Sequence, residues 1–380
     1  MDALDGCLID FSTQPYPQVL AHASRPWGAL ELRLLRELTG LERHSTNLTN
    51  YGRAGNLMAI ASREVVNELL HRAAVSNVEV IAIGSHGQTV MHRPDLHFSV
   101  QLDNAPYLAA LTGIDVVSNF RSADLAHGGE GAPLTPAFHA GMFAQKDHAA
   151  LVLNLGGIAN LTVINAQGEV LKGYDTGPAN TLMDLTCRTL LNIPYDQNGE
   201  IARSGQVQED WLSHFLSYPY FRRPAPKSTG TEEFGAAFIA AQLQSCRENR
   251  RRAQDLLRTL LELTAQSALY NLPEFVSAGT IDRHSTLIVC GGGAFNTLLM
   301  ERLTELAAQH SLKTVISSER GIDPQIIECA AFAWLARRCC LGIATDLRSV
   351  SGARECSILG TLSPALHGHY QHQCLGHADN

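Results

Sequence analysis

The sequence is short of the features that mark membrane, secreted and nucleic-acid-binding proteins. No stretch of its 380 residues approaches the roughly 20 consecutive apolar residues that a transmembrane helix requires. The N-terminus lacks the basic and then apolar pattern of a signal peptide. Acidic residues outnumber basic ones, 37 to 29, and the net charge of −8 offers no basic field to a nucleic-acid backbone. These absences predict a cytoplasmic protein with no membrane and no nucleic acid among its partners.

Recognisable disulfide, P-loop and metal motifs are also missing. The nine cysteines include no C-x-x-C pair, which is typical of reduced, mostly buried thiols. No G-x-x-x-x-G-K-[ST] motif occurs, since "PAPKSTG" at 224–230 lacks the leading glycine, and this argues against a P-loop enzyme. His86, His92 and His97 share one segment without the spacing of a metal site. Four histidines near the C-terminus are expected in a solvated tail, namely His367, His369, His372 and His377.

What the sequence contains is an alternation of apolar strand-like runs with helical patterns, which predicts an α/β fold. The alternation runs through two cycles, and each opens on an apolar strand beside a turn of small residues. We therefore expect two like domains that face a cleft. The first spans residues 1–145, with 340–366 packing back on it. The second spans 146–339, and residues 367–380 are expected to form a disordered tail.

Three stretches carry clear local expectations. Residues 78–83, "VEVIAI", have the composition of a buried strand that ends at Gly84. Residues 232–244 are expected to form a long helix. Residues 151–164, "LVLNLGGIANLTVI", predict two strands joined by Gly156 and Gly157, a pair that suits a type I′ turn.

The glycine-rich turns each have two interpretations. Gly156 and Gly157 form either a hairpin turn alone or a turn whose N–H groups approach a phosphate, because no Cβ stands in the way. Asn154 and Asn160 favour the second interpretation, since they add polar groups to a turn that needs none. The three glycines of "VCGGGAFN" follow a strand and precede a helix. Such turns are common, and they also hold nucleotides at the start of a helix.

Asp175, in "GYDTGPAN" at 173–180, follows an apolar strand and precedes a turn that leads into a helix. In a structural role it would cap that turn or that helix. In a catalytic role it stands at the carboxyl end of a strand, where open α/β sheets bind ligands. As a carboxylate at neutral pH it would then take a proton from a nucleophile. Spacing alone leaves both roles open.

Seven segments, taken in order, closely resemble one family. They are "GSHGQT", "NFRSADLAHGGEGAPLTPAFH", "LNLGGIANLT", "GYDTGPANTLMD", "PAPKSTG", "CGGGAFN" and "ECAAFAWLA". Over about residues 2–360 the chain resembles anhydro-N-acetylmuramic acid kinase, of the sugar kinase, Hsp70 and actin-like ATPase superfamily. The resemblance implies two ribonuclease-H-like domains flanking a central cleft and, at the level of the family, a homodimer.

The resemblance also implies a reaction on a small amino sugar. ATP phosphorylates O6 of 1,6-anhydro-N-acetylmuramic acid while water opens the anhydro ring at C1. The product is N-acetylmuramic acid 6-phosphate, formed in the recycling of cell-wall peptidoglycan. Asp175 matches the base that deprotonates the water. The nucleotide side is expected to include Gly156, Gly157, Asn160, Gly291, Gly292, Gly293 and Asn296, and the sugar pocket His86, Gln88, Arg121, Asp124 and Glu328.

The family's first phosphate loop has the pattern Ser-Gly-Thr-Ser-x-Asp-Gly-x-Asp, and only its last part is present. Asp2 and Asp5 match the two aspartates on the nucleotide side, and Ala3 replaces the glycine. Asp2 is the expected carboxylate for Mg²⁺, held through water. Either translation starts upstream of Met1, or the chain is a catalytically impaired homologue that binds a sugar or nucleotide. A third hypothesis is another sugar kinase of the same superfamily, with the same fold and a different substrate.

Three further positions depart from the family pattern. Asn119 stands in place of a common aspartate, Thr231 in place of an arginine and Gly235 in place of an asparagine. Because an arginine offers several fixed donors, its loss would weaken substrate binding if Thr231 lies at the ligand.

Overall fold

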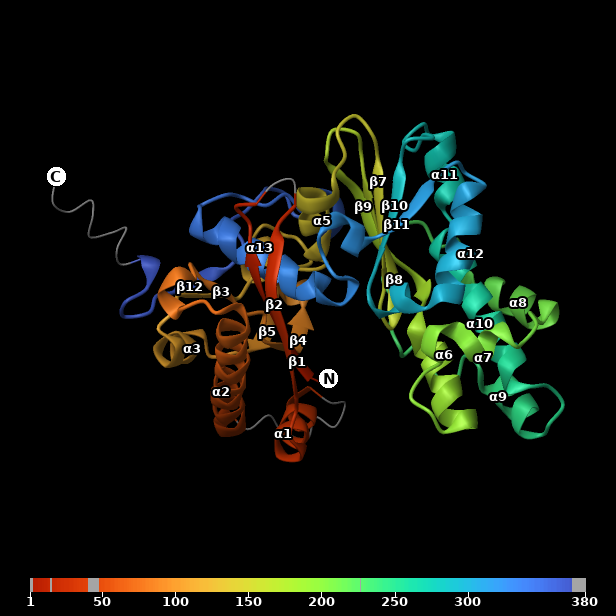
Figure 1. Cartoon of the computed structure of the whole chain (residues 1–380), viewed down its shortest axis with the longest axis horizontal. Helices are drawn as coiled ribbons and strands as arrows, with labels where there is room; N and C mark the ends of the chain where they lie inside the picture. The colour runs from red at the N-terminus through yellow and green to blue at the C-terminus, as the bar shows by residue number, and fades with distance from the viewer. Residues whose placement is uncertain (1–2, 14–15, 40–47, 226, 371–380) are drawn as a thin grey trace. The chain divides into compact units, whose positions relative to one another are not determined.

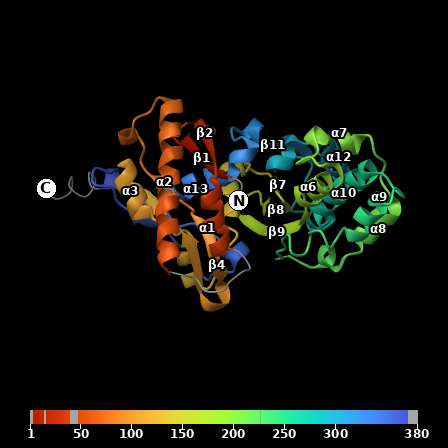
Figure 2. The same cartoon turned by 90° about the horizontal axis from the view of Figure 1, so that it is seen from below.

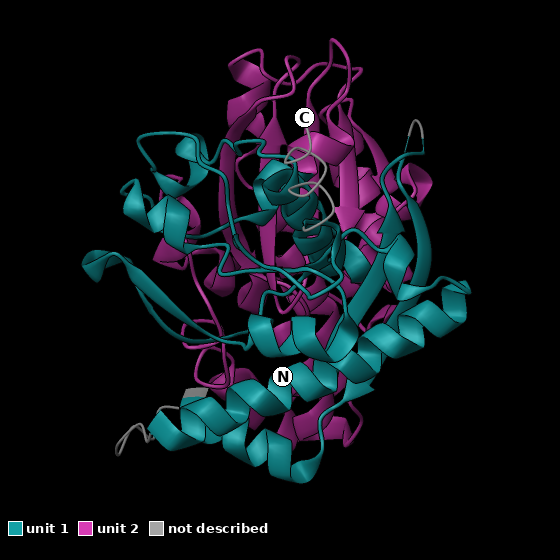
Figure 3. Cartoon of the chain, turned by 90° about the vertical axis from the view of Figure 1, so that its left-hand side faces the viewer, with its two compact units in different colours: residues 1–138, 326–380 teal, residues 139–325 magenta. Residues whose placement is uncertain are grey.

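A computed structural model describes residues 3–13, 16–39, 48–225 and 227–370 of the chain (Figure 1). The chain divides into two compact units, residues 1–138 with 326–380 (unit 1) and residues 139–325 (unit 2) (Figure 3). Each unit is a mixed α/β structure, which confirms the expected fold class. The helix over 327–340, which the sequence-based division assigns to the second domain, belongs to unit 1. In the part of the chain described, no helix is both long and apolar enough to cross a bilayer.

Unit 2 is built on one five-stranded sheet. Its strands are β7 (Ala150–Leu155), β8 (Ile158–Ile164), β9 (Val170–Pro178), β10 (Thr286–Cys290) and β11 (Lys313–Ile316). Its helices are α6 (Asn180–Thr186), α7 (Glu200–Arg203), α8 (Glu209–Leu216), α9 (Ala240–Arg247), α10 (Ala253–Ala268), α11 (Leu272–Ser277) and α12 (Thr297–Ala308). The strand order is β11-β10-β7-β8-β9. The β7–β8 and β8–β9 pairs are antiparallel, whereas β10 runs parallel to both β7 and β11.

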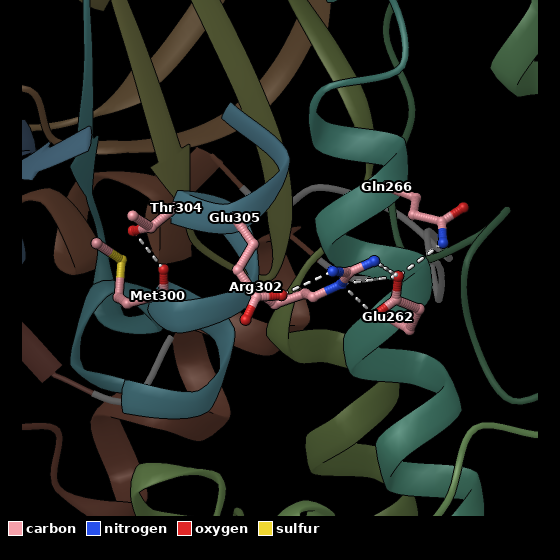
Figure 4. A network of polar contacts seen from close by, with 6 residues as sticks. All are labelled: Glu262, Gln266, Met300, Arg302, Thr304 and Glu305. Atoms are coloured by element: carbon pink, nitrogen blue, oxygen red, sulfur yellow. Dashed lines mark hydrogen bonds and ion pairs between the residues drawn. The ribbon is translucent and has the colours of Figure 1, made fainter. Parts of the chain in front are cut away.

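The core of unit 2 lies between this sheet and its helices. β10 is buried along its whole length, as expected of a strand with neighbours on both edges and helices on its faces. α10 packs against α7 and α12 (Figures 1 and 2). A charged link joins α10 to α12, because Arg302 donates to both carboxylate oxygens of the buried Glu262 (Figure 4). Gln266 donates to the same carboxylate at 2.7 Å.

Unit 1 contains shorter strands and one long helix. Its strands are β1 (Ala3–Asp10), β2 (Gln18–Pro26), β3 (Ile83–Gly84), β4 (Gln88–Arg93), β5 (Phe98–Leu102), β6 (Val116–Ser118) and β12 (Thr361–Ser363). Its helices are α1 (Ala29–Thr39), α2 (Leu48–Ala73), α3 (Ala105–Thr112), α4 (Ser122–Ala126), α13 (Ile327–Cys340) and α14 (Arg348–Ser351). A further helix, α5 (Thr135–Phe143), crosses the boundary into unit 2.

The strands of unit 1 pack against α2 and α13. A Cβ added to Gly6 of β1 would lie 2.7 Å from Cγ1 of Val65 in α2. A Cβ added to Gly84 of β3 would lie 2.3 Å from the carbonyl oxygen of Phe332 in α13. Both distances are shorter than real Cβ contacts, so each glycine is required by the close approach of a helix.

The two units share a pattern of strand pairing. β1 and β2 form an antiparallel pair, as β8 and β9 do, and β3 runs parallel to β6, as β10 does to β11. In unit 2 these pairs are joined through β7. Unit 1 has no strand in the place of β7 among the residues that the structure describes, and its pairs belong to separate sheets, β1-β2 and β12-β6-β3.

This difference explains a wrong prediction. Residues 78–83 were expected to form a buried strand, but Asn77–Glu79 forms a 3-10 turn and only Ile83–Gly84 is a strand. Val78 and Ile81 are 68% and 62% exposed. β3 pairs with β6 alone, whereas β10 has a neighbour on each edge. A strand with one neighbour has fewer ladder hydrogen bonds and less apolar cover.

Two other expectations differ from the structure. The helix predicted over 232–244 begins at Ala240, because the preceding residues form a series of turns around the buried ring of Phe234. Two residues of the expected disordered tail have contacts: His369 contacts the carbonyl of Val78, and Tyr370 donates its backbone N–H to Asp115. Residues 371–380 lie outside the described part of the chain.

Candidate active site

A row of polar side chains crosses three neighbouring strands of the unit 2 sheet, β7, β8 and β9. Asn154 on β7 lies opposite Asn160 on β8, and Asn160 lies opposite Asp175 on β9. Directly opposed residues of antiparallel strands leave the sheet on the same face. The register shifts between Ala159 and Asn160, so that Thr176 forms a bulge next to Asp175. Bulges of this kind redirect side chains and occur beside active sites.

Asp175 is held by a segment that lies about fifty residues further along the chain. Its Oδ2 accepts hydrogen bonds from the hydroxyl of Ser228 at 2.9 Å and from the backbone N–H of Thr229 at 3.0 Å. Its own N–H donates to the carbonyl of Lys227 at 3.1 Å. The hydroxyl of Tyr220 donates to its carbonyl at 2.7 Å. Backbone and side chain are therefore both fixed.

The other carboxylate oxygen of Asp175, Oδ1, accepts no hydrogen bond from any residue that the structure describes. Burial raises the pKa of Asp175, and the carboxylate of Glu232 raises it further. The N–H of Thr229 and the hydroxyl of Ser228 oppose this rise. The result is a carboxylate that is more basic than an exposed one, with one oxygen fixed and one available.

The turn between β7 and β8 is not the expected type I′ turn, since neither Gly156 nor Gly157 has the positive φ that this type requires. Two other features account for this turn: there is no room for a Cβ at Gly157, and the carbonyl groups of both glycines accept hydrogen bonds. A Cβ at Gly157 would lie 2.7 Å from the hydroxyl of Thr181. The carbonyl of Gly157 accepts from the N–H groups of Ala179 and Thr181, and that of Gly156 from Asn180. The N–H groups of Gly156 and Gly157 donate to no residue in the described ranges.

The turn at Gly291, Gly292 and Gly293 packs onto the turn at Gly156 and Gly157. A Cβ at Gly291, which has a φ of 80°, would lie 2.6 Å from Oδ1 of Asn154. A Cβ at Gly293 would lie 2.7 Å from Cβ of Leu155. Asn180 bridges the region, because its side chain donates to the carbonyl of Leu155 at 3.1 Å. The predicted nucleotide-side glycines of unit 2 are thus close together.

Asn296 has a structural contact of its own. It is the N-cap of α12, and its side-chain oxygen accepts from the N–H of Leu299 at 3.1 Å. Gly199 lies against the same oxygen, where an added Cβ would be 2.4 Å away.

In unit 1, Arg121 and His86 form a second candidate site. Arg121 donates to Nε2 of His86 at 2.8 Å and to the carbonyl of Gly131 at 2.7 Å. The imidazole packs against Phe332, with ring centroids 4.4 Å apart and the rings tilted by 33°. Burial, with the guanidinium as a second cause, lowers the pKa of His86 to about 4, so the ring is neutral. The Nε of Arg121 is buried and has no partner among the described residues, which suits a group that receives an acceptor from a ligand.

The other predicted sugar-side residues differ in their surroundings. Asp124 is 1% exposed, and its two oxygens accept from Ser351 and from the N–H of Gly131. It therefore supports the loop that Arg121 contacts. Gln88 begins β4 opposite Leu102. Glu328 lies exposed in the first turn of α13, where its charge acts on Arg121.

The acidic residues at the N-terminus do not form a described site. Asp5 is exposed within β1, opposite Ser24, and does not lie in a turn. Asp2, the predicted carboxylate for Mg²⁺, lies outside the described residues. In the ranges that are described, no group of three or more metal-ligating side chains occurs.

Two of the three departures from the family pattern, Asn119 and Gly235, have local explanations. Asn119 has a φ of 54°, a left-handed conformation that asparagine tolerates. Thr231 is exposed. An added Cβ at Gly235 would lie 2.4 Å from the carbonyl of Thr231, so this turn accommodates only glycine at 235.

Sequence reasoning missed four polar residues at this site, namely Asn180, Thr181, Ser228 and Thr229. Ser228 and Thr229 lie in "PAPKSTG", and Asn180 and Thr181 lie in "GYDTGPANTLMD", two of the segments that resemble the family. That resemblance was the available signal, because nothing local to "PAPKSTG" points to Asp175.

Comparisons with known proteins agree on one family. A family model described as anhydro-N-acetylmuramic acid kinase matches residues 1–365. The anhydro-N-acetylmuramic acid kinase of Shewanella sediminis is 41% identical over 367 residues, 96% of each chain. That of Shewanella baltica strain OS223 is 42% identical over 367 residues, 95% of each chain.

Solved structures align at low identity. An activator of 2-hydroxyisocaproyl-CoA dehydratase from Clostridium difficile, with bound ADPNP, aligns with 87% of this chain and 92% of its own at 11% identity and a TM-score of 0.42. A ROK hexokinase from Thermus thermophilus covers 88% and 100% at 14% identity and a TM-score of 0.35. On the family model and the curated relatives, the chain belongs to the anhydro-N-acetylmuramic acid kinase family.

Proposed function

We propose that the protein uses ATP to convert 1,6-anhydro-N-acetylmuramic acid into N-acetylmuramic acid 6-phosphate, with Asp175 as the general base. The observation that carries the proposal is the state of that carboxylate: Oδ2 is held by Ser228 and Thr229, and Oδ1 is without a partner in the described chain. Family membership supplies the substrate.

In the proposed reaction, Oδ1 of Asp175 takes a proton from water as the water oxygen bonds to C1 of the sugar. The C1–O6 bond breaks, and its electron pair stays on O6. O6 then bonds to the γ-phosphorus of ATP, and the bond from that phosphorus to the bridging oxygen breaks to release ADP. A raised pKa makes the carboxylate a better proton acceptor.

The phosphates of ATP are proposed to lie at the two glycine turns of unit 2. Two features support this: the N–H groups of Gly156 and Gly157 are available, and an added Cβ at Gly157 or Gly293 would meet neighbouring atoms at 2.7 Å. Backbone N–H groups in such turns bind phosphate oxygens. Asn160 lies opposite Asp175 and is proposed to face the transferred phosphoryl group.

Mg²⁺ is proposed to enter with ATP. A hard cation of this kind is commonly held by one or two carboxylates together with phosphates and water, and its charge offsets that of the phosphates. The described residues offer no cluster of ligands for it. Asp2 remains the predicted carboxylate.

The sugar is proposed to bind Arg121, His86, Gln88 and Glu328, with Asp124 as support for the loop at Gly131. Anhydro-N-acetylmuramic acid carries a lactyl carboxylate, which suits the buried guanidinium of Arg121. The homodimer and the cytoplasmic location stay predictions.

The test is turnover of the anhydro sugar by the wild-type protein and by Asp175→Asn. The amide cannot take the proton, so we expect turnover to fall by about 10²–10⁴-fold while ATP still binds. Asp147→Asn is the matched control, because Asp147 is exposed and asparagine tolerates its left-handed φ of 64°.

Three outcomes would overturn the proposal. Normal turnover by Asp175→Asn would show that Asp175 is not the general base. Binding of sugar and nucleotide by the wild-type protein without turnover would favour the impaired homologue. Preference for glucose or free muramic acid would favour a different sugar kinase.

A further inference from the structure

We propose that residues 227–233 form a clamp that makes Oδ1 the proton-accepting oxygen of Asp175, with Ser228, Thr229 and Glu233 as positioning residues. This inference rests on the proposed role of Asp175 and gives a role to three residues that the sequence analysis did not assign to the site.

The clamp holds Asp175 by three hydrogen bonds. Ser228 and the N–H of Thr229 donate to the same oxygen, Oδ2, at 2.9 and 3.0 Å. The carbonyl of Lys227 accepts from the N–H of Asp175. A carboxylate whose one oxygen already accepts two hydrogen bonds keeps its charge available mainly at the other oxygen. The two donors therefore have two effects. They leave Oδ1 as the oxygen that accepts the proton, and they prevent rotation of the carboxylate.

Glu233 supports the clamp through a hydrogen bond with the side chain of Thr229. Its Oε2 accepts from the hydroxyl of Thr229 at 2.6 Å, and it is 18% exposed. The N–H groups of Glu233 and Phe234 donate to the carbonyl of Gly230, which closes the turn, and the ring of Phe234 is fully buried. Thr229 thus joins Glu233 to Asp175 through its side chain and its backbone.

The first residue of the clamp is anchored as well. The ammonium group of Lys227 donates to the carbonyls of Tyr220 and Phe221 at 3.3 and 3.2 Å, and it lies 4.7 Å from the centre of the Tyr220 ring. Tyr220 in turn donates to the carbonyl of Asp175. The titratable groups that interact with the carboxylate are Glu232 and Tyr220, and Tyr220 also senses the charges of Glu233 and Arg223.

The test is the pH dependence of kcat/KM for the anhydro sugar in Ser228→Ala and Ser228→Thr. A hydrogen bond to the charged form lowers a carboxyl pKa, so its loss raises the pKa of the base. The base acts when ionised, so the acid limb of the profile should move up by about 0.5–1 pH unit in Ser228→Ala. Ser228→Thr keeps the hydroxyl and should restore the wild-type limb.

Glu233 is tested by rescue. Glu233→Ala should lower kcat about tenfold, because the clamp loses its support. Glu233→Gln keeps an oxygen that accepts from Thr229 and should recover most of the rate. Glu209→Ala is the matched control, since Glu209 is an exposed glutamate outside the clamp, and it should match the wild type.

The results separate this inference from the proposed function. Suppose that Asp175→Asn is inactive but the acid limb of Ser228→Ala stays at its wild-type pH, with or without a loss of rate. The clamp inference is then wrong, and the assignment of Asp175 as the base is retained. If Asp175→Asn is fully active, the proposed function fails first. Equal rates for Glu233→Ala and the wild type would also overturn the clamp. Unfolding midpoints of every variant identify a loss that comes from misfolding.

Discussion

Asn160 lies directly opposite Asp175 on the neighbouring strand, so their side chains leave the same face of the unit 2 sheet. Opposed residues of antiparallel strands have Cβ atoms about 4.5–5.5 Å apart. An amide at this position is polar and uncharged, so it leaves the charge of the candidate base undisturbed. The position is therefore sensitive to the introduction of charge.

Asn160→Asp places a second carboxylate beside Asp175. A like charge disfavours ionisation, so the pKa of Asp175 should rise and the acid limb of kcat/KM should move up by about 1 pH unit. The measurement is the pH profile for the anhydro sugar. Asn160→Ala removes the amide without adding charge and should leave the acid limb in place, whatever it does to the rate. An unmoved limb in Asn160→Asp would show that the two side chains do not interact.

Gly157→Ala should weaken ATP binding. The new Cβ would lie 2.7 Å from the hydroxyl of Thr181, so the turn or that side chain must shift. We expect the KM for ATP to rise at least about tenfold, because about 1.4 kcal/mol of binding energy is readily lost when donor geometry changes. The double variant Gly157→Ala with Thr181→Ala removes the colliding hydroxyl and should recover part of the affinity.

The control for that change is Gly52→Ala in α2. Nothing lies within 4 Å of a Cβ at Gly52, and alanine is the better helix former by about 1 kcal/mol. This variant should keep its KM for ATP and gain stability. A raised KM in Gly52→Ala would mean that the assay reports folding and not the nucleotide site.

Arg302→Met should destabilise the protein by about 3–5 kcal/mol. It leaves the carboxylate of Glu262, which is 4% exposed, without its charged partner (Figure 4). The measurement is the free energy of unfolding in urea. Arg33→Met is the comparison, because its pair with Glu37 is exposed and is expected to contribute less than about 0.5 kcal/mol. Glu262→Gln with Arg302→Met should be more stable than Arg302→Met alone.

His86 should make stability depend on pH. Its pKa in the fold is about 4, below the value of about 6.5 for an unfolded chain. Between these values the unfolded state binds more protons, so the free energy of unfolding should rise with pH, by about 3 kcal/mol at most. His86→Gln should flatten this part of the curve, as measured by urea unfolding from pH 4 to 7.

Asp103 changes the free energy of unfolding with pH in the opposite direction to His86, and it therefore serves as the check. Burial raises its pKa to about 6, from about 4 when unfolded. The folded state binds more protons over that interval, so Asp103 lowers stability as pH rises. Asp103→Asn should therefore steepen the rise that His86 causes. If the two variants change the slope in the same direction, the assignment to these groups is wrong.

Local sequence patterns predicted much of the secondary structure of unit 2. The strands on either side of Gly156 and Gly157 and the strand–turn–helix at Gly291 formed where the pattern predicts them. A strand also formed before Asp175, but β9 continues through Asp175 to Pro178, where the pattern predicts a turn. Each depends on alternation of apolar residues and on turn residues that are neighbours in the chain. The family could be recognised for the same reason, since its motifs are short and continuous.

The failures came where distant partners decide the structure. Residues 78–83 have the composition of a buried strand, yet Val78 and Ile81 are exposed because β3 pairs on one edge only. Residues 232–239 have helical composition, yet they turn around Phe234 and the carbonyl of Gly230. Apolar content states that a segment can be buried, and only its neighbours decide whether it is.

The amino-acid sequence by itself determined the α/β class of the fold, the family and the candidate base, because these depend on local periodicity and on contiguous motifs. Tertiary structure alone decided which groups surround that base: Ser228 donates to Asp175 across 53 residues, and Arg121 donates to His86 across 35. Hydrogen-bond partners so far apart are chosen by the packing that brings their segments together, and no local pattern encodes that choice.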